Sequence, residues 1–224
     1  MTARRRAVTA WAQQSGGLVI EDDYDGEFRY DRRAVGALQG MAPDHVIYIG
    51  TSSKALAPAV GLGWAVVPQA RMAMLLARRP VLGEPRDTLN QLTLAEFIAA
   101  HSYDRHVRRM RAEYRRRREY LAARLAARVP AARLAGVPAG IQALAVLPDG
   151  CDPDQVTAAG LRRGLAFSAL REYAASGGTR PAAVVLGFGA SPANRALADI
   201  DLAVAAIEDG ITDHARLAKE RADR

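Results

Sequence analysis

The sequence predicts an α/β layer fold, and two observations support this prediction. Short runs of β-branched and aromatic residues end in turn residues, as buried strands do, at Leu18–Glu21, Val46–Ile49 and Leu62–Val67. Segments with helical patterns flank these runs, at about residues 3–15 and 69–79. Strands that alternate with helices are typical of a sheet covered by helices, so we expect a layered α/β arrangement.

The rest of the chain predicts long helices followed by a smaller α/β unit. Helices are expected at Thr88–Ala100 and at Tyr103–Arg128, and Val129–Gly140 is rich in Pro, Gly and Ala, which is typical of a connection. The charged tail after Asp209 is expected to fray. The elements expected in between are the strands Ile141–Leu147, Leu165–Leu170 and Ala183–Phe188 and the helices Pro153–Arg163 and Leu197–Ile207.

Composition narrows the class of protein. The chain has 224 residues, of which 50% are hydrophobic and 25% are charged, as in a soluble globular protein of one large or two small domains. A single cysteine, Cys151, excludes an internal disulfide and predicts a reducing, cytoplasmic location. The four histidines lack metal-ligand spacing, so no metal site is predicted. No apolar run approaches the ~20 residues that a membrane span requires.

Positive charge is concentrated in the predicted helix Tyr103–Arg128. The net charge is +7, and the segment Arg105–Glu119 alone holds eight arginines, which raises the hypothesis of a nucleic-acid surface. A solvated helix with one buried side is favoured, because an apolar stripe runs along one face and the arginines fall largely on the other faces. The apolar stripe that would be buried consists of Val107, Met110, Tyr114, Leu121 and Leu125.

A carboxylate stands where the first predicted strand ends. Side chains alternate along a strand, so Ile20 and Asp22 share one face and Glu21 lies on the other. Open α/β sheets build ligand sites at the carboxyl ends of their strands. A buried Asp22 carboxylate could there hold the ring N–H of a pyridoxal phosphate, and the phenol of Tyr24 could donate to the oxygen substituent of the same ring.

A lysine follows the second predicted strand by one turn. Lys54 could carry the cofactor as a Schiff base, which requires an amine that is partly neutral, and desolvation at the sheet end would lower its pKa. The hydroxyls of Thr51 and Ser53 and the backbone N–H groups of the turn suit a phosphate. An acidic turn alone and a Ser-Ser-Lys loop alone are each better explained as ordinary structure, but the two together favour a site.

These stretches resemble a known family. Val19–Tyr30 and Val46–Pro58 closely resemble the effector domain of MocR-type transcriptional regulators of the GntR superfamily, which itself resembles class I/II aminotransferases of fold type I. The similarity continues through Asn90–Phe97, Tyr103–Tyr114 and Leu186–Phe188.

The resemblance implies an architecture for the whole chain. Residues 1–85 would be the C-terminal half of a large pyridoxal-phosphate-binding domain with a mixed, mostly parallel sheet. Residues 86–128 would be linking helices, and residues 129–224 a small C-terminal α/β domain. The resemblance also suggests a homodimer.

The resemblance further implies a role for each matching residue. Lys54 would carry pyridoxal 5'-phosphate as a Schiff base and act as the catalytic residue in an active enzyme. Asp22 would hold the pyridine nitrogen and Tyr24 the ring oxygen, and Thr51 and Ser53 would lie near the phosphate. The ligand sensed would be a small amine or amino acid, and DNA would be bound only through an upstream winged-helix domain that this chain lacks.

Three departures from the family pattern stand out. Gly61 occupies the position of an arginine that clamps the phosphate. Val184-Val185 stand where aminotransferases carry a carboxylate-binding arginine, and Arg180 lies several residues earlier. The upstream half of the large domain is absent, so the chain resembles the C-terminal portion of a longer protein, and we expect it to expose sheet edges and apolar faces.

Four functions therefore compete. The first is the effector-sensing domain of a regulator. The second is an active aminotransferase that transfers an amino group between an amino acid and a 2-oxo acid. The third is a truncated remnant that binds no cofactor, and a nucleic-acid-binding module is a distant fourth.

Overall fold

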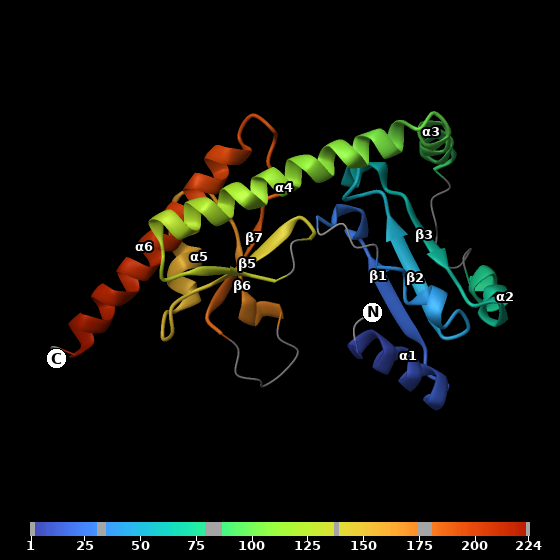
Figure 1. Ribbon diagram of the computed structural model, residues 1–224, viewed down its shortest axis with the longest axis horizontal. Helices are drawn as coiled ribbons and strands as arrows, with labels where there is room; N and C mark the ends of the chain where they lie inside the picture. Colours follow the sequence, from blue (N-terminus) through green and yellow to red (C-terminus); the bar gives the residue numbers. More distant parts are fainter. Residues whose placement is uncertain (1–2, 31–34, 79–86, 137–138, 174–180, 223–224) are drawn as a thin grey trace. The chain divides into compact units, whose positions relative to one another are not determined.

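The structure is a computed structural model that describes residues 3–30, 35–78, 87–136, 139–173 and 181–222 (Figure 1). The chain forms two compact units, Met1–Met110 and Arg111–Arg224, and each is described by itself. The division predicted from the sequence, at residues 85 and 128, stays a prediction. Within the described ranges, no helix is long and apolar enough to cross a membrane.

The first unit contains a three-stranded sheet in the order β1-β2-β3. Helix α1 (Ala3–Ser15) precedes β1 (Val19–Asp23), and β2 (Val46–Thr51) and β3 (Gly63–Val66) follow, close to the predicted runs. β1 pairs with β2 in parallel, whereas β2 pairs with β3 antiparallel. The segment between β2 and β3 carries only a single 3-10 turn and no crossover helix, so the chain reverses direction there.

Apolar side chains are exposed over much of this unit, as expected. The prediction of a buried first strand is wrong, because β1 alternates and its Ile20 is 63% exposed. Strand β3 is exposed along its whole length, including Trp64 and Val66. Helices α2 (Gln69–Arg78) and α3 (Thr88–Ala99) have no buried residue. Their exposed large apolar side chains are Met74, Leu75, Leu76, Leu89, Leu92 and Ile98.

Helix α4 (Ser102–Arg128) is the long helix predicted from the arginine-rich segment. The predicted apolar stripe is confirmed in its main part, because Val107, Tyr114, Leu121 and Leu125 are buried. His101, with a φ of 56°, lies between α3 and α4 and is the non-glycine residue with positive φ in the described chain.

The second unit contains a four-stranded sheet in the order β4-β5-β7-β6, and all its pairs are antiparallel. The mixed, mostly parallel sheet is expected for residues 1–85, where one strand pair is parallel and one antiparallel; the larger sheet of the chain is antiparallel, so the sheets are not mostly parallel. The strands β5, β6 and β7 occupy predicted positions, although β6 is short, and β4 lies in the segment predicted to be a connection. Their bounds are β4 (Arg133–Ala135), β5 (Gln142–Val146), β6 (Ser168–Ala169) and β7 (Ala183–Gly187).

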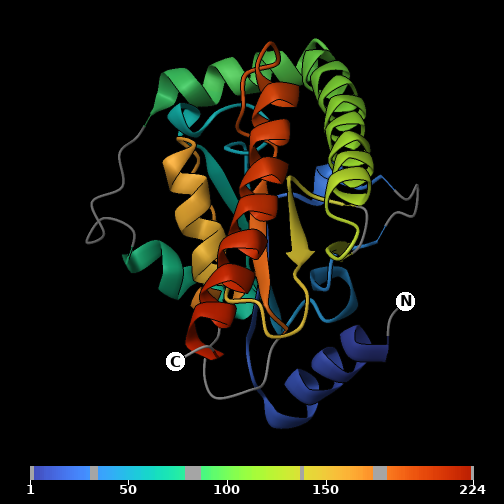
Figure 2. The ribbon, with the colours of Figure 1, turned by 90° about the vertical axis from the view of Figure 1, so that its left-hand side faces the viewer.

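Helices α5 (Pro153–Arg162) and α6 (Ala196–Ala222) lie side by side in this unit (Figure 2). The prediction of a frayed tail after Asp209 is wrong, because α6 continues to Ala222. Asp209 accepts from Arg163 at 2.6 Å and Asp213 from Arg162 at 2.7 Å, so the charged tail pairs with the end of α5. A Cβ at Gly210 would lie 2.5 Å from the Val156 Cα, so glycine permits the close approach of the two helices.

Several arginines of α4 within this unit have structural partners. Arg117 is an exception to the predicted solvated face, since it is only 2% exposed. Its Nη1 donates to the carbonyl oxygens of Phe188 (3.0 Å) and Ser191 (2.9 Å). Arg124 pairs with Asp201 on α6 at 2.6 Å, and Arg128 pairs with Glu208. Such pairing favours a packed helix over a nucleic-acid surface.

The buried guanidinium of Arg117 predicts a large stability effect. Arg117→Ala leaves one buried and one partly buried carbonyl oxygen without their donor, so we expect the free energy of opening of β5 and β7 to fall by about 3 kcal/mol. Hydrogen exchange of the β5 and β7 amides measures this. The matched variant Arg115→Ala removes a half-exposed side chain 4.0 Å from Glu119 and should cost about 0.5 kcal/mol or less. Equal effects of the two changes would contradict the structural role.

Candidate functional site

The parallel pairing of β1 and β2 brings the two predicted halves of the site to one edge of the sheet (Figure 1). Asp22 is the Cα partner of Ile49, and Asp23 is the partner of Gly50. Both strands therefore end together, and the acidic turn after β1 and the lysine turn after β2 leave the sheet at the same edge. This is where open α/β sheets place ligands.

The two aspartates at the end of β1 lie on opposite faces of the sheet. Asp22 is exposed and shares its face with Ile20 and Ile49, as side-chain alternation predicts. Asp23 is partly buried on the other face, where its Oδ2 accepts from the Tyr48 hydroxyl at 3.0 Å. The expected burial of the Asp22 carboxylate is therefore wrong, because the sheet face that carries it has no covering layer among the described residues.

Glu21 has a structural role on the face opposite to Asp22. Its carboxylate accepts from the backbone N–H groups of Leu38 (2.9 Å) and Gln39 (3.1 Å). Arg5 of α1 lies 3.4 Å away and pairs with it. The carboxylate thereby connects α1 and the loop before β2 to strand β1.

The acidic turn after β1 concentrates negative charge. Burial, reinforced by the neighbouring carboxylates of Asp23 and Glu27, raises the pKa of Asp25. Gly26 lies against the Asp23 carboxylate, because a Cβ there would be 2.3 Å from Oδ1. Tyr24, predicted to contact a cofactor ring, is 38% exposed.

The lysine turn is built on hydroxyl groups. The Thr51 hydroxyl accepts the backbone N–H of Ser53 at 3.1 Å and lies 2.9 Å from the Ser53 hydroxyl. Ser52, which sequence reasoning missed, is fully buried and donates its hydroxyl to the carbonyl oxygen of Leu62 at 3.0 Å. The Ser52 backbone N–H donates to the same oxygen at 3.0 Å. These bonds attach the turn to the residue that precedes β3.

Lys54 is exposed at the tip of this turn. In the described part of the chain, neither a hydrogen bond nor an ion pair engages its amine. The expected desolvation of this amine is therefore wrong for the described structure. Its position is nevertheless compatible with a ligand, because no salt bridge has to be broken before the amine can react.

Gly61 adopts a left-handed conformation, with φ of 62°. It closes the 3-10 turn Pro58–Val60, and its N–H donates to the carbonyl oxygen of Pro58 at 3.1 Å. The residue that replaces the family's arginine therefore also has a backbone role. Left-handed backbone favours glycine over side chains with a Cβ.

Side chains from α3 and α4 bind the backbone around the lysine. Asn90 of α3 donates to the carbonyl oxygen of Val60 at 3.1 Å. The Nε2 atom of His106 on α4 lies 2.7 Å from the carbonyl oxygen of Ala55. Sequence reasoning missed both residues. The signal for His106 was present, because it lies in a stretch used for the family resemblance, but its partner is 51 residues away.

The side chains at this edge fit pyridoxal phosphate in part. An exposed carboxylate and an exposed amine suit the pyridine nitrogen and the aldehyde, respectively. For the phosphate, the turn offers the Thr51 and Ser53 hydroxyls, which already contact each other. Position 61 supplies no cation.

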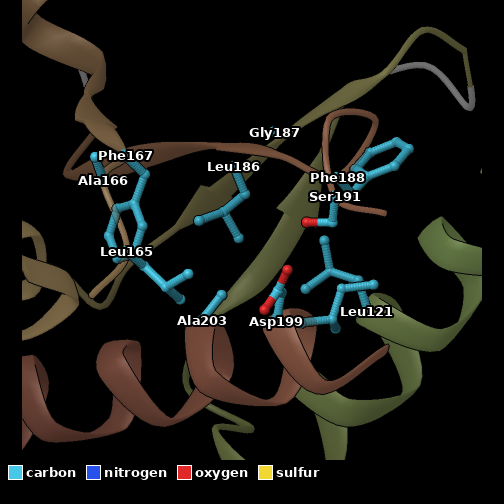
Figure 3. A pocket seen from close by; sticks show the side chains of 11 residues that line it. Leu121, Leu165, Ala166, Phe167, Leu186, Gly187, Phe188, Ser191, Asp199 and Ala203 are labelled. Carbon is cyan, nitrogen blue, oxygen red and sulfur yellow. The ribbon is translucent and has the colours of Figure 1, made fainter. Parts of the chain in front are cut away.

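The second unit has a small cavity of its own (Figure 3). It measures about 70 Å³, and Asp199 and Ser191 lie at one end of it and Leu165 and Phe167 at the other (Figure 3). Leu186 and Phe188 face the cavity and belong to the buried core. Val184, at the position of the family's carboxylate-binding arginine, is also fully buried, and Arg180 lies outside the described residues.

Comparisons with known proteins identify the family to which the chain is similar. The family profile "Aminotransferase class I and II" matches residues 4–169. The HTH-type pyridoxine biosynthesis transcriptional regulator PdxR of Corynebacterium glutamicum is 34% identical over 189 residues, which are 83% of this chain and 40% of that protein. The probable rhizopine catabolism regulatory protein MocR of Rhizobium meliloti is 37% identical over 106 residues, 47% of this chain and 22% of that protein.

Solved structures show the same fold at lower identity. LysN, an α-aminoadipate aminotransferase of Thermus thermophilus crystallised with N-(5'-phosphopyridoxyl)-L-leucine, matches with a TM-score of 0.80 and 20% identity. The match covers 93% of this chain and 54% of the LysN chain. This chain thus spans well under two thirds of the length of the relatives and structures it matches.

The Tyr48–Asp23 contact predicts an alkaline titration. Burial, together with the hydrogen bond to the Asp23 carboxylate, raises the pKa of Tyr48 from 10.0 to about 12. Because the folded pKa is raised, the stabilisation is complete below pH ~10 and is lost as the pH rises through ~12. The difference in tyrosinate absorbance between the chain and its Tyr48→Phe variant measures this. Asp23→Asn should lower the Tyr48 pKa, whereas Asp22→Asn, on the other face, should leave it unchanged.

Proposed function

The chain belongs to the class I and II aminotransferase family, and we propose that it is a pyridoxal-phosphate-binding domain that acts as the effector-sensing part of a MocR-type transcriptional regulator. The cofactor is held as a Schiff base on Lys54. The sensed molecule is a small amine or amino acid. DNA binding belongs to a separate domain, as the HTH-type name of the regulator PdxR suggests.

One observation supports the cofactor site above all others: the parallel pairing of β1 and β2, which puts the Asp22 and Lys54 turns at the same sheet edge. The small number of lysines in the chain also supports Lys54 as the amine of this site. The chain contains 29 arginines but only two lysines, Lys54 and Lys219. Arginine stays protonated at neutral pH and cannot serve as the amine nucleophile, so Lys54 is the side chain suited to that role at this edge.

Each residue of the site has a separate role in binding. The Lys54 amine would hold the cofactor through its aldehyde carbon, with loss of water. Asp22 would accept a hydrogen bond from the ring N–H and keep the nitrogen protonated, and Tyr24 would donate its phenol to the ring oxygen. Thr51 and Ser53 would orient the phosphate. When bound, the cofactor supplies an aldehyde that amines can exchange onto and a ring that withdraws electrons.

Two other functions make different predictions. An active aminotransferase, suggested by the fold shared with LysN, requires Lys54 also to move the Cα proton of an amino acid. The buried Val184 disfavours it, because aliphatic side chains cannot pair with a substrate carboxylate. A remnant without cofactor is suggested by Gly61. Amino-group transfer to a 2-oxo acid supports the enzyme, and failure of cofactor binding supports the remnant.

Covalent trapping tests the Schiff base on Lys54 directly. Incubation with pyridoxal phosphate should produce visible absorbance, and borohydride, which adds hydride to the C=N carbon, should fix a phosphopyridoxyl group on the amine. Peptide mass spectrometry is expected to find it on Lys54. Lys54→Ala should abolish both signals, and Lys219→Arg should leave them unchanged. Trapping at Lys219 or at the N-terminus only, or no trapping at all, would overturn the proposal.

The role of Asp22 predicts a loss of cofactor affinity. Asp22→Asn preserves the size of the side chain but removes the charge that holds the pyridine N–H, a contact worth about 1.5–3 kcal/mol. We therefore expect the dissociation constant of pyridoxal phosphate to rise by roughly ten- to a hundredfold in an absorbance titration. Asp23→Asn, on the opposite face and bonded to Tyr48, serves as the matched control. Equal losses in both variants would argue against a specific role for Asp22.

A further inference from the structure

We propose that His106 is a positioning residue for Lys54: its imidazole fixes the backbone of the turn that presents the amine. The importance of Lys54 in this inference rests on the proposed function. The effect of His106 on the backbone of the turn does not depend on the cofactor. Ala55 directly follows Lys54, and its carbonyl oxygen lies 2.7 Å from the Nε2 of His106. Both residues belong to the first unit.

The partners of the ring specify its protonation. A carbonyl oxygen can only accept, so Nε2 must carry the proton in the contact with Ala55. The guanidinium Nη2 of Arg109 lies 3.2 Å from Nδ1, and a guanidinium can only donate. Both ring nitrogens are therefore engaged at the same time, Nε2 with the Ala55 carbonyl oxygen and Nδ1 with the Arg109 guanidinium.

Aromatic neighbours hold the ring in this orientation. Phe97 of α3 lies 6.5 Å from the imidazole between ring centroids, and also 6.5 Å from Tyr103 in an edge-to-face arrangement. Such contacts favour a defined ring geometry. Because α3 and α4 both contribute to this cluster, the donor is directed at Ala55 by packing as well as by the hydrogen bond.

The same face of α4 also binds the acidic half of the site. Tyr103 precedes His106 by three residues and so lies on the same side of the helix. Its hydroxyl donates to Glu27 at 2.8 Å, just after the acidic turn, and burial together with this bond raises the Tyr103 pKa. One helical segment thus contacts the chain just after the acidic turn and within the lysine turn.

The turn itself offers a local reporter of its order. The backbone N–H of Leu56 donates to the Ser52 carbonyl oxygen at 2.8 Å and closes the turn around Lys54. Loss of the His106 donor leaves the Ala55 carbonyl, in a residue that is only 2% exposed, without that partner. The turn then opens more often, and the Leu56 amide exchanges its hydrogen faster.

Two amide substitutions separate positioning from general packing. The side-chain nitrogen of glutamine lies as many bonds from Cβ as His Nε2 does, whereas that of asparagine corresponds to Nδ1. His106→Gln should therefore retain the donor to Ala55, and His106→Asn should lose it. His106→Ala removes both the donor and the ring.

Hydrogen exchange of the cofactor-free chain tests the proposal. We expect the Leu56 amide to exchange roughly three- to tenfold faster in His106→Asn and His106→Ala, and within about twofold of the parent in His106→Gln. His45→Ala is the matched control, because His45 contacts the Gly17 carbonyl oxygen at 3.1 Å and precedes β2 rather than following it. It should accelerate exchange near residue 17, not at Leu56. Unchanged exchange at Leu56 in His106→Asn, or equal acceleration in all three His106 variants, would overturn the proposal.

A second readout links the turn to the proposed cofactor chemistry. The rate of borohydride trapping on Lys54 should fall in His106→Asn and recover in His106→Gln. If the parent chain traps no cofactor, the proposed function fails while the exchange result still decides the role of His106. If the parent traps cofactor and His106→Asn traps it as fast, the positioning role fails while the proposed function stands.

Discussion

The structure depends on the parallel register between β1 and β2. Five consecutive Cα pairs, from Val19↔Val46 to Asp23↔Gly50, bring two segments that are distant in sequence to the same sheet edge. A shift of one residue would move Asp22 to the opposite face, because side chains alternate along a strand. On β2 the register is specified by burial, because Val46 is fully buried, whereas Ile20 of β1 is exposed. On β1 it is specified by Glu21, whose carboxylate accepts a backbone N–H of the loop before β2.

The lysine turn shows how an exposed amine can still have a defined position. Side chains donate to the backbone carbonyl oxygens of Ala55, Val60 and Leu62, from His106, Asn90 and Ser52, respectively. Each such bond contributes only about 1 kcal/mol net, but together they restrict the backbone on both sides of the lysine. The order of the turn therefore comes from its carbonyl groups, and the amine can stay accessible.

Sequence reasoning found the elements more reliably than their long-range partners. Local periodicity is sufficient to locate the end of β1 near Asp22, the end of β2 before Lys54 and the apolar stripe on α4. The antiparallel pairs, the burial of Arg117 and the contact of His106 with Ala55 depend on residues dozens of positions away, and no local pattern encodes them. The continuation of α6 beyond Ile207 was missed because its charged tail pairs with Arg162 and Arg163, which helical periodicity alone does not show.

The presence of Gly61 in place of the family's arginine affects the backbone of the loop as well as the side chain at this position. An arginine there would gain a charge-assisted phosphate contact of about 1.5–3 kcal/mol. In the left-handed conformation of Gly61, however, a side chain with a Cβ costs about 1–2 kcal/mol, and relief of that strain would disturb the turn closed by the Pro58 carbonyl oxygen. The strain would therefore offset a large part of what the contact contributes. Cofactor affinity in this chain therefore has to rest on Lys54 and Asp22, whose geometry the two parallel strands and α4 provide.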